Sequence, residues 1–312
     1  MSDTTMKAIV VNDYGGADQL HLETVARPAP PQADQVLVRM VSAGVHPADW
    51  KYRSGAYKAF MPLTFPWTPG LDGSAVIESV GSGVTYFQPG QPVYGRISRS
   101  YAEYALAPAA DLVPKPANLS FDQAAAVPVG ALTAWGTVVE VAAVQPGQTV
   151  LVQGAAGGVG LFVVQLAHMK GAHVIGTASA RNADFVRSLG ADQVIDYQAG
   201  PFEKSVHDVD IVIDTVGGEV SQRSLQVLHP GGLFVTIAGM PPEEQAKALG
   251  VRVARGTRPG PDVLSEITRL IESEKIRPVV GPAFPLAEAG AAQAQGETGH
   301  GRGRILLHIS NP

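Results

Sequence analysis

The chain has 312 residues, of which 45% are hydrophobic and 16% are charged, and its formal net charge is −5. This length predicts two compact domains, and the acidic balance argues against nucleic acid or an anionic membrane as the main partner, because both attract a basic surface. Since the sequence contains no cysteine, it excludes disulfides, thiolate nucleophiles, iron–sulfur clusters and cysteine-ligated zinc.

Two features predict a cytoplasmic protein. Residues 1–7 are polar and lack the apolar core of a signal peptide. No apolar run approaches the roughly 18 residues that are needed to span a bilayer.

The first part of the chain is typical of a mostly antiparallel β domain. Short apolar stretches are separated by segments rich in glycine and proline, such as the turn-rich residues 26–34. The expected strands are 7–11, 35–41, 74–80, 91–94 and 103–107.

From about residue 122, apolar strands alternate with helical periodicity, which predicts a doubly wound parallel sheet covered on both faces. The expected strands are 149–153, 173–179, 194–197, 210–216 and 232–238. The expected helices are 159–170, 181–189, 220–228 and 262–274. From about residue 277 the chain returns to loops and strands and ends on a strand at 304–309.

A glycine-rich turn, TVLVQGAAGGVG, links the strand at 149–153 to the next helix. Such a turn exposes backbone N–H groups and a positive helix end to a pyrophosphate. Gly157 permits close approach of the phosphates and Gly160 permits close packing of helix on strand, although Ala155 replaces the usual first glycine of the fingerprint. Glycine-rich turns also form merely to let elements pack, but the β–α–β context favours nucleotide binding. The expected contacts are Ala156, Gly157, Gly158, Val159 and Gly160.

The end of the next strand indicates which cofactor is used. Dinucleotide sites for NADH carry an acidic residue there, about 20 residues beyond the glycines, which binds the ribose hydroxyls. This chain has Ser179 and Arg181 instead. A hydroxyl and a guanidinium can bind a ribose 2′-phosphate, so we predict NADPH. The alternative is that Arg181 is a solvated residue in the first turn of a helix.

Seven motifs in order resemble the medium-chain dehydrogenase/reductase superfamily and, within it, the zinc-independent quinone oxidoreductase branch that includes zeta-crystallin. They extend over nearly the whole chain. The motifs are 43–55 (AGVHPADWKYRSG), 69–83 (PGLDGSAVIESVGSG), 128–136 (PVGALTAWG), 154–160 (GAAGGVG), 188–197 (SLGADQVIDY), 214–218 (DTVGG) and 299–304 (GHGRGR).

The resemblance implies an α/β protein in which a Rossmann domain is combined with a GroES-like, mostly antiparallel β catalytic domain. The catalytic domain would comprise residues 1–121 and 277–312, and the NADP-binding domain residues 122–276. The resemblance also implies an active site in the cleft between them and a homodimer.

The resemblance further implies that no zinc is bound. Zinc-dependent members carry cysteine, a His–Glu pair and a further ligand where this chain has His46, Leu71 with Asp72, and Val129. One imidazole and one carboxylate are too few, because zinc needs three or four converging ligands.

Several single residues acquire expected roles from the resemblance. His46 stands beside the nicotinamide, where related enzymes commonly have asparagine; it either fills the slot as a neutral ring or carries charge near pH 7. Tyr57 matches a tyrosine proton donor of enoyl reductases, while Tyr52 and Arg53 shape the pocket. Asp49 and Asp72 are expected to be structural. The remaining expected cofactor contacts are Thr133 and Gly239 at the nicotinamide half, Tyr197 near the adenosine phosphate, and Val216.

The leading hypothesis is NADPH-dependent hydride transfer to a quinone or an enone, a small electrophilic substrate. An enoyl-thioester reductase is the nearest alternative. A non-catalytic NADPH-binding structural or RNA-binding member of the family is the second, although the sequence has no basic run that would favour RNA.

Overall fold

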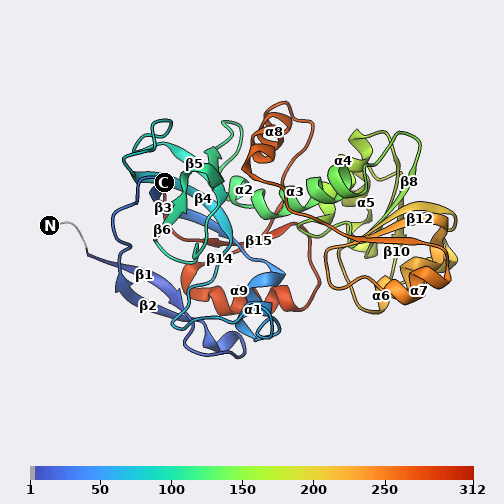
Figure 1. The fold of residues 1–312 in the computed structure, drawn as a ribbon, viewed down its shortest axis with the longest axis horizontal. Coiled ribbons are helices and arrows are strands. Elements are labelled where there is room, and N and C mark those ends of the chain that lie inside the picture. The colour runs from blue at the N-terminus through green and yellow to red at the C-terminus, as the bar shows by residue number, and fades with distance from the viewer. Residues whose placement is uncertain (1–3) are drawn as a thin grey trace. The chain divides into compact units, whose positions relative to one another are not determined.

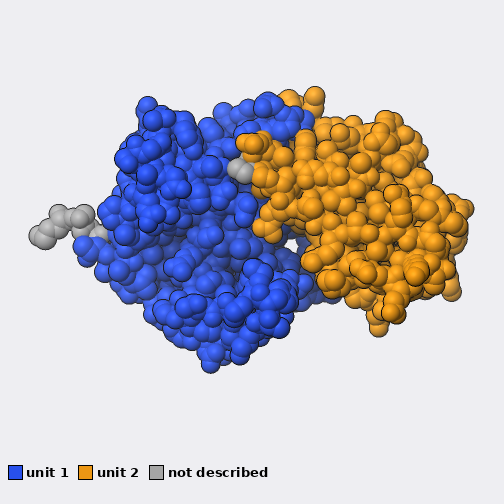
Figure 2. Space-filling view, viewed as in Figure 1, with its two compact units in different colours: residues 1–129, 264–272, 278–312 blue, residues 130–263, 273–277 orange. Residues whose placement is uncertain are grey.

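The computed structural model describes residues 4–312, and so the first three residues of the polar N-terminal stretch lie outside the described residues. The chain forms two compact units, coloured separately in Figure 2. The first unit takes its described residues from Met1–Val129, Leu264–Glu272 and Pro278–Pro312, and the second comprises Gly130–Val263 and Ser273–Arg277.

The first unit is built on a seven-stranded sheet in which β14, β15, β3, β4, β5 and β7 follow in order and β6 pairs with β3. All its pairs are antiparallel except β14 with β15. A separate hairpin joins β1 and β2. The strands are β1 (Thr5–Val10), β2 (His21–Ala26), β3 (Gln35–Gly44), β4 (Asp72–Val80), β5 (Pro92–Arg96), β6 (Tyr104–Pro108), β7 (Leu112–Pro114), β14 (Val280–Pro285) and β15 (Arg304–His308).

Strand β3 shows why this sheet forms. Its first half alternates, with Val36, Val38 and Met40 buried and their neighbours partly exposed, as expected for a strand with one face on a core. Its last five residues are all buried. The helices that pack with this unit are α1 (Pro47–Arg53), α2 (Phe121–Ala125), most of α8 (Pro261–Glu272) and α9 (Ala289–Glu297).

The second unit contains a six-stranded sheet in which every pair is parallel. Its order is β10-β9-β8-β11-β12-β13, which is the 3-2-1-4-5-6 order of a doubly wound dinucleotide-binding fold. Figure 1 shows α4 and α5 on one side of this sheet and α6 and α7 on the other. The strands are β8 (Thr149–Gln153), β9 (His173–Ala178), β10 (Gln193–Asp196), β11 (Val209–Asp214), β12 (Leu228–Thr236) and β13 (Arg252–Arg255). The helices are α3 (Pro128–Trp135), α4 (Gly160–Met169), α5 (Ala183–Arg187), α6 (Glu219–Ser224), α7 (Glu243–Ala248) and a π-helix at Gly136–Val141.

The predicted fold class is confirmed: a parallel Rossmann sheet is combined with a mostly antiparallel sheet. Two expected helices are shorter than their periodicity suggested, because a 3-10 turn precedes α5 and another follows α6. The 3-10 turns lie at Ala17–Gln19, Ala109–Asp111, Ala180–Asn182, Phe202–Lys204, Leu225–Val227 and Leu286–Glu288.

Several elements were not predicted from the sequence: β2, β7, β13, β14, α1, α2, α3, α7 and α9. Helix α9 shows the reason, because AGAAQAQGE has small residues all round and no apolar stripe. Across residues 4–312, no helix combines the length and the apolar character that crossing a membrane requires.

Candidate cofactor and active site

The expected cofactor contacts of the second unit gather at one edge of its parallel sheet. Gln153 at the end of β8 pairs with Asp214 at the end of β11, which in turn pairs with Thr236 at the end of β12. The carboxyl ends of the strands therefore lie level, and the segments that follow them share one edge. That edge carries Ala156, Gly157, Gly158, Val159 and Gly160 after β8, Ser179 and Arg181 after β9, Tyr197 after β10, Val216 after β11 and Gly239 after β12.

The two key glycines of the turn stand in different surroundings. A Cβ on Gly160 would lie 2.2 Å from the carbonyl oxygen of Gly154 and 3.0 Å from the Cα of Ala155, so this position has no room for a side chain. A Cβ on Gly157 would meet only the Gly154 oxygen, at 3.3 Å. Gly157 is half-buried whereas Gly160 is buried. Gly160 thus packs helix on strand, whereas a side chain at Gly157 would make a single tight contact with the protein.

The side chain of Ala155, which replaces the usual first glycine, fits because a neighbouring strand leaves space for it. Its side chain is fully buried, and a Cβ on Gly176 of β9 would lie 2.9 Å from the Ala155 methyl group. Glycine at position 176 therefore leaves the space that the methyl group fills. The departure from the fingerprint leaves the turn intact.

Helix α4 begins directly after this turn and provides the anion-binding end. Its N-cap residue is Val159, whose side chain makes no capping hydrogen bond. The N–H groups of Leu161 and Phe162 donate to the carbonyl oxygens of Gly157 and Val159, each at 3.0 Å, and the N–H group of Gly157 donates to Gly154 at 3.0 Å. The helix dipole at this end favours negative charge. The turn therefore presents a positive helix end, which favours an anionic pyrophosphate.

Asp214 shapes the neighbouring loop, a role that the sequence alone did not reveal. This carboxylate is fully buried, and its Oδ1 accepts hydrogen bonds from the N–H groups of Val216 (2.8 Å) and Gly217 (3.0 Å). Its Oδ2 accepts from the Ser221 hydroxyl at 2.5 Å. The loop is held so that Val216 is 52% exposed at the strand edge. The available signal was an aspartate that ends an apolar strand before Thr-Val-Gly-Gly, since aspartate often binds backbone N–H groups two residues on.

The residues expected to select NADPH differ in how exposed they are and in whether they already have hydrogen-bond partners. Arg181 is exposed and takes part in none of the ion pairs found within residues 4–312. Tyr197 is 43% exposed beyond β10, the strand that pairs with β9. Ser179 is buried, and its Oγ accepts a hydrogen bond from the Asn182 side-chain amide at 3.3 Å. Arg181 is thus the readier partner for a phosphate, while Ser179 is already engaged.

Helix α3 brings Thr133 to the same region. A Cβ on Gly130 would lie 2.4 Å from the carbonyl oxygen of Gly158, so the helix packs closely on the glycine-rich turn. Thr133 follows within one helical turn and is half-buried. This placement is compatible with the expected contact to the nicotinamide half of the cofactor.

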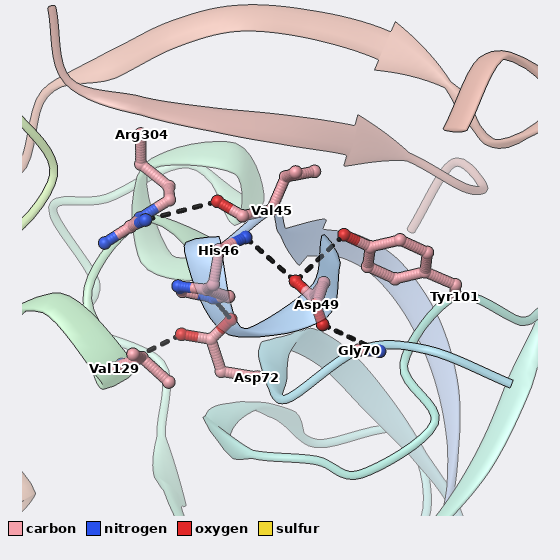
Figure 3. A network of polar contacts seen from close by, with 8 residues as sticks. All are labelled: Val45, His46, Asp49, Gly70, Asp72, Tyr101, Val129 and Arg304. Atoms are coloured by element: carbon pink, nitrogen blue, oxygen red, sulfur yellow. Dashed lines mark hydrogen bonds and ion pairs between the residues drawn. The ribbon is translucent and has the colours of Figure 1, made fainter. Parts of the chain in front are cut away.

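The first unit contains a buried polar cluster around His46 (Figure 3). His46 is 2% exposed, and its Nε2 lies 2.6 Å from Oδ1 of Asp72, which is 1% exposed. The other carboxylate oxygen of Asp72 accepts a hydrogen bond from the N–H group of Val129 at 2.8 Å. Arg304 is also buried and donates to the carbonyl oxygen of Val45 at 3.2 Å. Figure 3 shows Arg304 and Tyr101 on opposite sides of His46.

Asp49 has the structural role expected of it. Its carboxylate accepts from the N–H groups of His46 (2.8 Å) and Gly70 (3.2 Å) and from the Tyr101 hydroxyl (3.1 Å). It thereby caps the start of α1 and ties the helix to a loop. Burial raises the pKa of Asp49, although His46 and the hydrogen bonds partly offset this. Burial alone would also raise the pKa of Asp72, but its contact with His46 brings that pKa below its ordinary value.

Tyr57 lies beyond the other end of α1, in a group of aromatic side chains. Its ring centroid lies 5.3 Å from that of Tyr52 and 5.1 Å from that of Phe60, and Lys51 Nζ lies 5.9 Å above it. The ring is half-buried whereas Phe60 is 67% exposed. Arg53, expected to shape the pocket, is buried and paired with Glu297.

The positions that match zinc ligands in zinc-dependent relatives do converge, but they bind one another. His46 bonds Asp72, and Asp72 bonds the backbone of Val129. Within residues 4–312 there is no group of three or more histidine, aspartate or glutamate side chains placed to hold a metal ion. The donor set therefore does not suit the tetrahedral coordination of zinc.

Comparison with known proteins is consistent with this geometry. Residues 32–117 match the family model of the alcohol dehydrogenase GroES-like domain, and residues 189–307 match that described as zinc-binding dehydrogenase. The chain is 37% identical to the chloroplastic NADPH-dependent alkenal/one oxidoreductase of Arabidopsis thaliana, over 97% of this chain and 79% of that protein. It is 34% identical to the quinone oxidoreductase of Mus musculus, over 96% of each chain. The solved quinone oxidoreductase of Coxiella burnetii is similar, with a TM-score of 0.90, 33% identity and coverage of 98% of this chain and 100% of that one.

Proposed function

Because the chain belongs to the medium-chain dehydrogenase/reductase superfamily, in its quinone oxidoreductase branch, we propose that it reduces a quinone or an enone with NADPH. The observation that carries this proposal is the edge of the parallel sheet. There a half-buried glycine, a helix start without a side-chain cap and an exposed arginine follow neighbouring strands, and residues 179–183 contain no acidic side chain.

NADPH fits the residues present. We propose that the backbone from Ala156 to Gly160 binds the pyrophosphate and that Arg181 and Tyr197, which follow the paired strands β9 and β10, bind the 2′-phosphate. Thr133, Val216 and Gly239 would contact the nicotinamide half. The cofactor supplies the hydride. The chain's own residues provide binding, orientation and hydrogen-bond donors for the substrate.

The donor set favours a substrate that is already electrophilic. A metal Lewis acid would need ligands that this cysteine-free chain does not offer around His46 and Asp72. Negative charge that develops on a carbonyl oxygen must therefore be met by protein N–H or O–H groups. Quinones and enones suit such a site, because their carbonyl oxygen accepts that charge directly.

The experiment that tests this function is oxidation of NADPH with a panel of quinones, enones and crotonyl thioesters. We expect turnover with quinones or enones and slow turnover with thioesters. Turnover confined to thioesters would assign the chain to enoyl-thioester reduction. No turnover with any of them, in a folded protein that binds NADPH, would contradict the proposal.

Replacing Arg181 with alanine is expected to weaken NADPH binding at least tenfold and to leave NADH binding unchanged. A hydrogen bond to a charged group contributes roughly 1.5–3 kcal/mol, and about 1.4 kcal/mol corresponds to one decade in affinity. Fluorescence titration with both cofactors measures this. Arg187→Ala is the matched control, because Arg187 is exposed on α5 and pairs with Asp184. Equal dissociation constants for NADPH and NADH in the unmodified protein would refute the assignment.

Replacing Tyr57 with phenylalanine is expected to slow enone reduction and to spare quinone reduction. A phenol has an O–H group that can deliver a proton to an enolate carbon, an assistance typically worth about 10²–10⁴-fold. Quinones acquire protons on oxygen and do not need this donor. The measurement is kcat for both substrates, with Tyr86→Phe as the control because Tyr86 is 60% exposed elsewhere in the first unit. Unchanged rates with both substrates would assign the proton to water.

The assembly and the location are also proposals. We propose a homodimer in the cytoplasm, with a small electrophile as the substrate and no nucleic acid as a partner. The resemblance to the quinone oxidoreductase branch supports the dimer, and the net charge of −5 argues against nucleic acid. Sedimentation equilibrium tests the dimer directly, since a single species of 32.5 kDa would contradict it.

A further inference from the structure

The buried cluster around His46 contains polar atoms that have no partner. His46 Nδ1 is shielded from solvent and makes no hydrogen bond within the described part of the chain. The same is true of Nε and Nη2 of Arg304. An unpaired polar group inside a protein is costly and calls for an explanation, of which a ligand that completes the bonding is one.

The other ring nitrogen of His46 is fixed. Asp72 has a lowered pKa and is ionised at neutral pH, and an ionised carboxylate can only accept hydrogen bonds. His46 Nε2 lies 2.6 Å from it and therefore carries a proton. Gly44 makes this approach possible, because a Cβ there would lie 2.4 Å from Asp72 Oδ1 and 2.6 Å from His46 Nε2. Asp72 thus holds the ring through Nε2, and Nδ1 is the ring nitrogen that can still form a hydrogen bond with a ligand.

The charges around the ring show which state of Nδ1 the cluster favours. Two buried carboxylates face His46: Asp72, and Asp49, whose two oxygens together accept three hydrogen bonds. Burial lowers the pKa of Arg304, but a guanidinium stays charged in proteins. Burial raises the pKa of Tyr101 well above its ordinary value, so its phenol stays neutral. Burial raises the pKa of Asp49, so Asp72 is the carboxylate whose charge acts most directly on the ring. The buried contact of His46 with Asp72 at 2.6 Å has the geometry of an ion pair.

We propose that Asp72 and Arg304 hold His46 as an imidazolium whose Nδ1–H donates to the substrate oxygen that becomes negative during reduction. The inference rests on the proposed function and deepens it. His46 is then the catalytic donor, and Asp72 and Arg304 are positioning residues. Arg304 Nη2 supplies a second unpaired N–H group in the same cluster.

The proton balance differs between the two substrate classes. When a quinone takes a hydride from NADPH, the His46 Nδ1–H proton passes to the quinolate oxygen, the ring becomes neutral while keeping its Nε2 proton, and solvent restores the lost proton after release. When an enone takes the hydride at its β-carbon, Nδ1–H hydrogen-bonds the enolate oxygen, and the Tyr57 phenol delivers the proton to the α-carbon. Each turnover consumes one NADPH and one solvent proton.

The test is the pH profile of kcat/KM for a quinone in four proteins: the unmodified chain, His46→Gln, Asp72→Asn and His229→Gln. The last is the matched control, because His229 forms a similar but exposed pair with Asp210 at 3.2 Å. We expect the unmodified chain and the control to lose activity as pH rises, because the donor must be protonated. His46→Gln should lose about a hundredfold at neutral pH. It should also lose the alkaline decline and bind NADPH within about twofold of normal.

The pH dependence of Asp72→Asn separates a positioning role from a merely structural one, because a purely structural change would not shift the pH at which activity declines. Without the carboxylate the imidazolium is less stable, so the alkaline decline should shift to lower pH while the rate at low pH is partly kept. An unshifted decline in Asp72→Asn, or an unchanged decline in His46→Gln, would overturn the inference. If the unmodified chain turned over no quinone or enone at all, the proposed function itself would fail, which is a distinguishable result.

A second measurement needs no variant and serves if the substituted proteins do not fold. All eight histidines lie within residues 4–312, and His46 alone among them is buried. In protein labelled with nitrogen-15 at histidine, the ring N–H signal that exchanges most slowly therefore reports His46. We expect both of its ring nitrogens to carry protons at neutral pH. A lone-pair shift at Nδ1 under those conditions would contradict the inference.

Discussion

Gly157→Val is expected to remove NADPH and NADH binding while the protein stays folded. The valine side chain would take up space at the turn that we propose binds the pyrophosphate, while its Cβ would meet one protein atom within 4 Å, the Gly154 oxygen at 3.3 Å. Losing two charge-assisted hydrogen bonds of about 1.5–3 kcal/mol each weakens binding by roughly 10²–10⁴-fold. Calorimetric titration with each cofactor measures this, and circular dichroism verifies the fold.

Gly157→Ala provides a graded comparison, since its single methyl group fills less of the same space. It should fold normally and bind with an intermediate affinity. If folded Gly157→Val bound either cofactor as tightly as the unmodified chain does, the pyrophosphate would have to lie elsewhere.

Gly160→Val is expected to destabilise the second unit itself. Its Cβ would lie 2.2 Å from the carbonyl oxygen of Gly154 and 3.0 Å from the Cα of Ala155, and backbone cannot move aside as a flexible side chain can. Overpacking costs typically about 1–3 kcal/mol and more against backbone, and about 1 kcal/mol lowers Tm by roughly 2–4 °C in a domain of this size. Thermal unfolding should therefore shift by on the order of 10 °C.

The control for this result is Gly157→Val, three residues earlier in the same turn, which should unfold near the temperature of the unmodified chain. A Gly160→Val protein with unchanged Tm would show that the close approach of helix α4 to β8 is not needed. The two glycines thus separate binding from folding within a single motif.

The cofactor edge could be predicted largely from sequence, because its features are local. Strand β8 is apolar, the glycines follow it directly, and α4 begins at once, so the order of residues implies the order of elements. The absence of an acid near Ser179 could likewise be found by counting along the chain. Asp214 was missed as a loop anchor because its partners include Ser221 and Thr236, which lie on other elements.

The resemblance implied that His46, Asp72 and Val129 lie close together, but the hydrogen bonds of the cluster around His46 could not be predicted, because they depend on contacts between distant segments. His46 meets Asp72 26 residues later, and Asp72 meets Val129 a further 57 residues on. Gly44 creates the necessary space, yet in sequence it looks like any glycine at a strand end. Helix α1 was missed as well, since seven residues with a proline at the start give too short a pattern for helical periodicity.

The most direct test of hydride transfer without metal assistance uses NADPH deuterated at the transferring position of C4 and protein treated with a chelator. The account predicts that an enone substrate is reduced at an undiminished rate and that mass spectrometry finds one deuterium on the β-carbon of the product. A product without deuterium, or activity that is lost on chelation and restored by zinc, would contradict it.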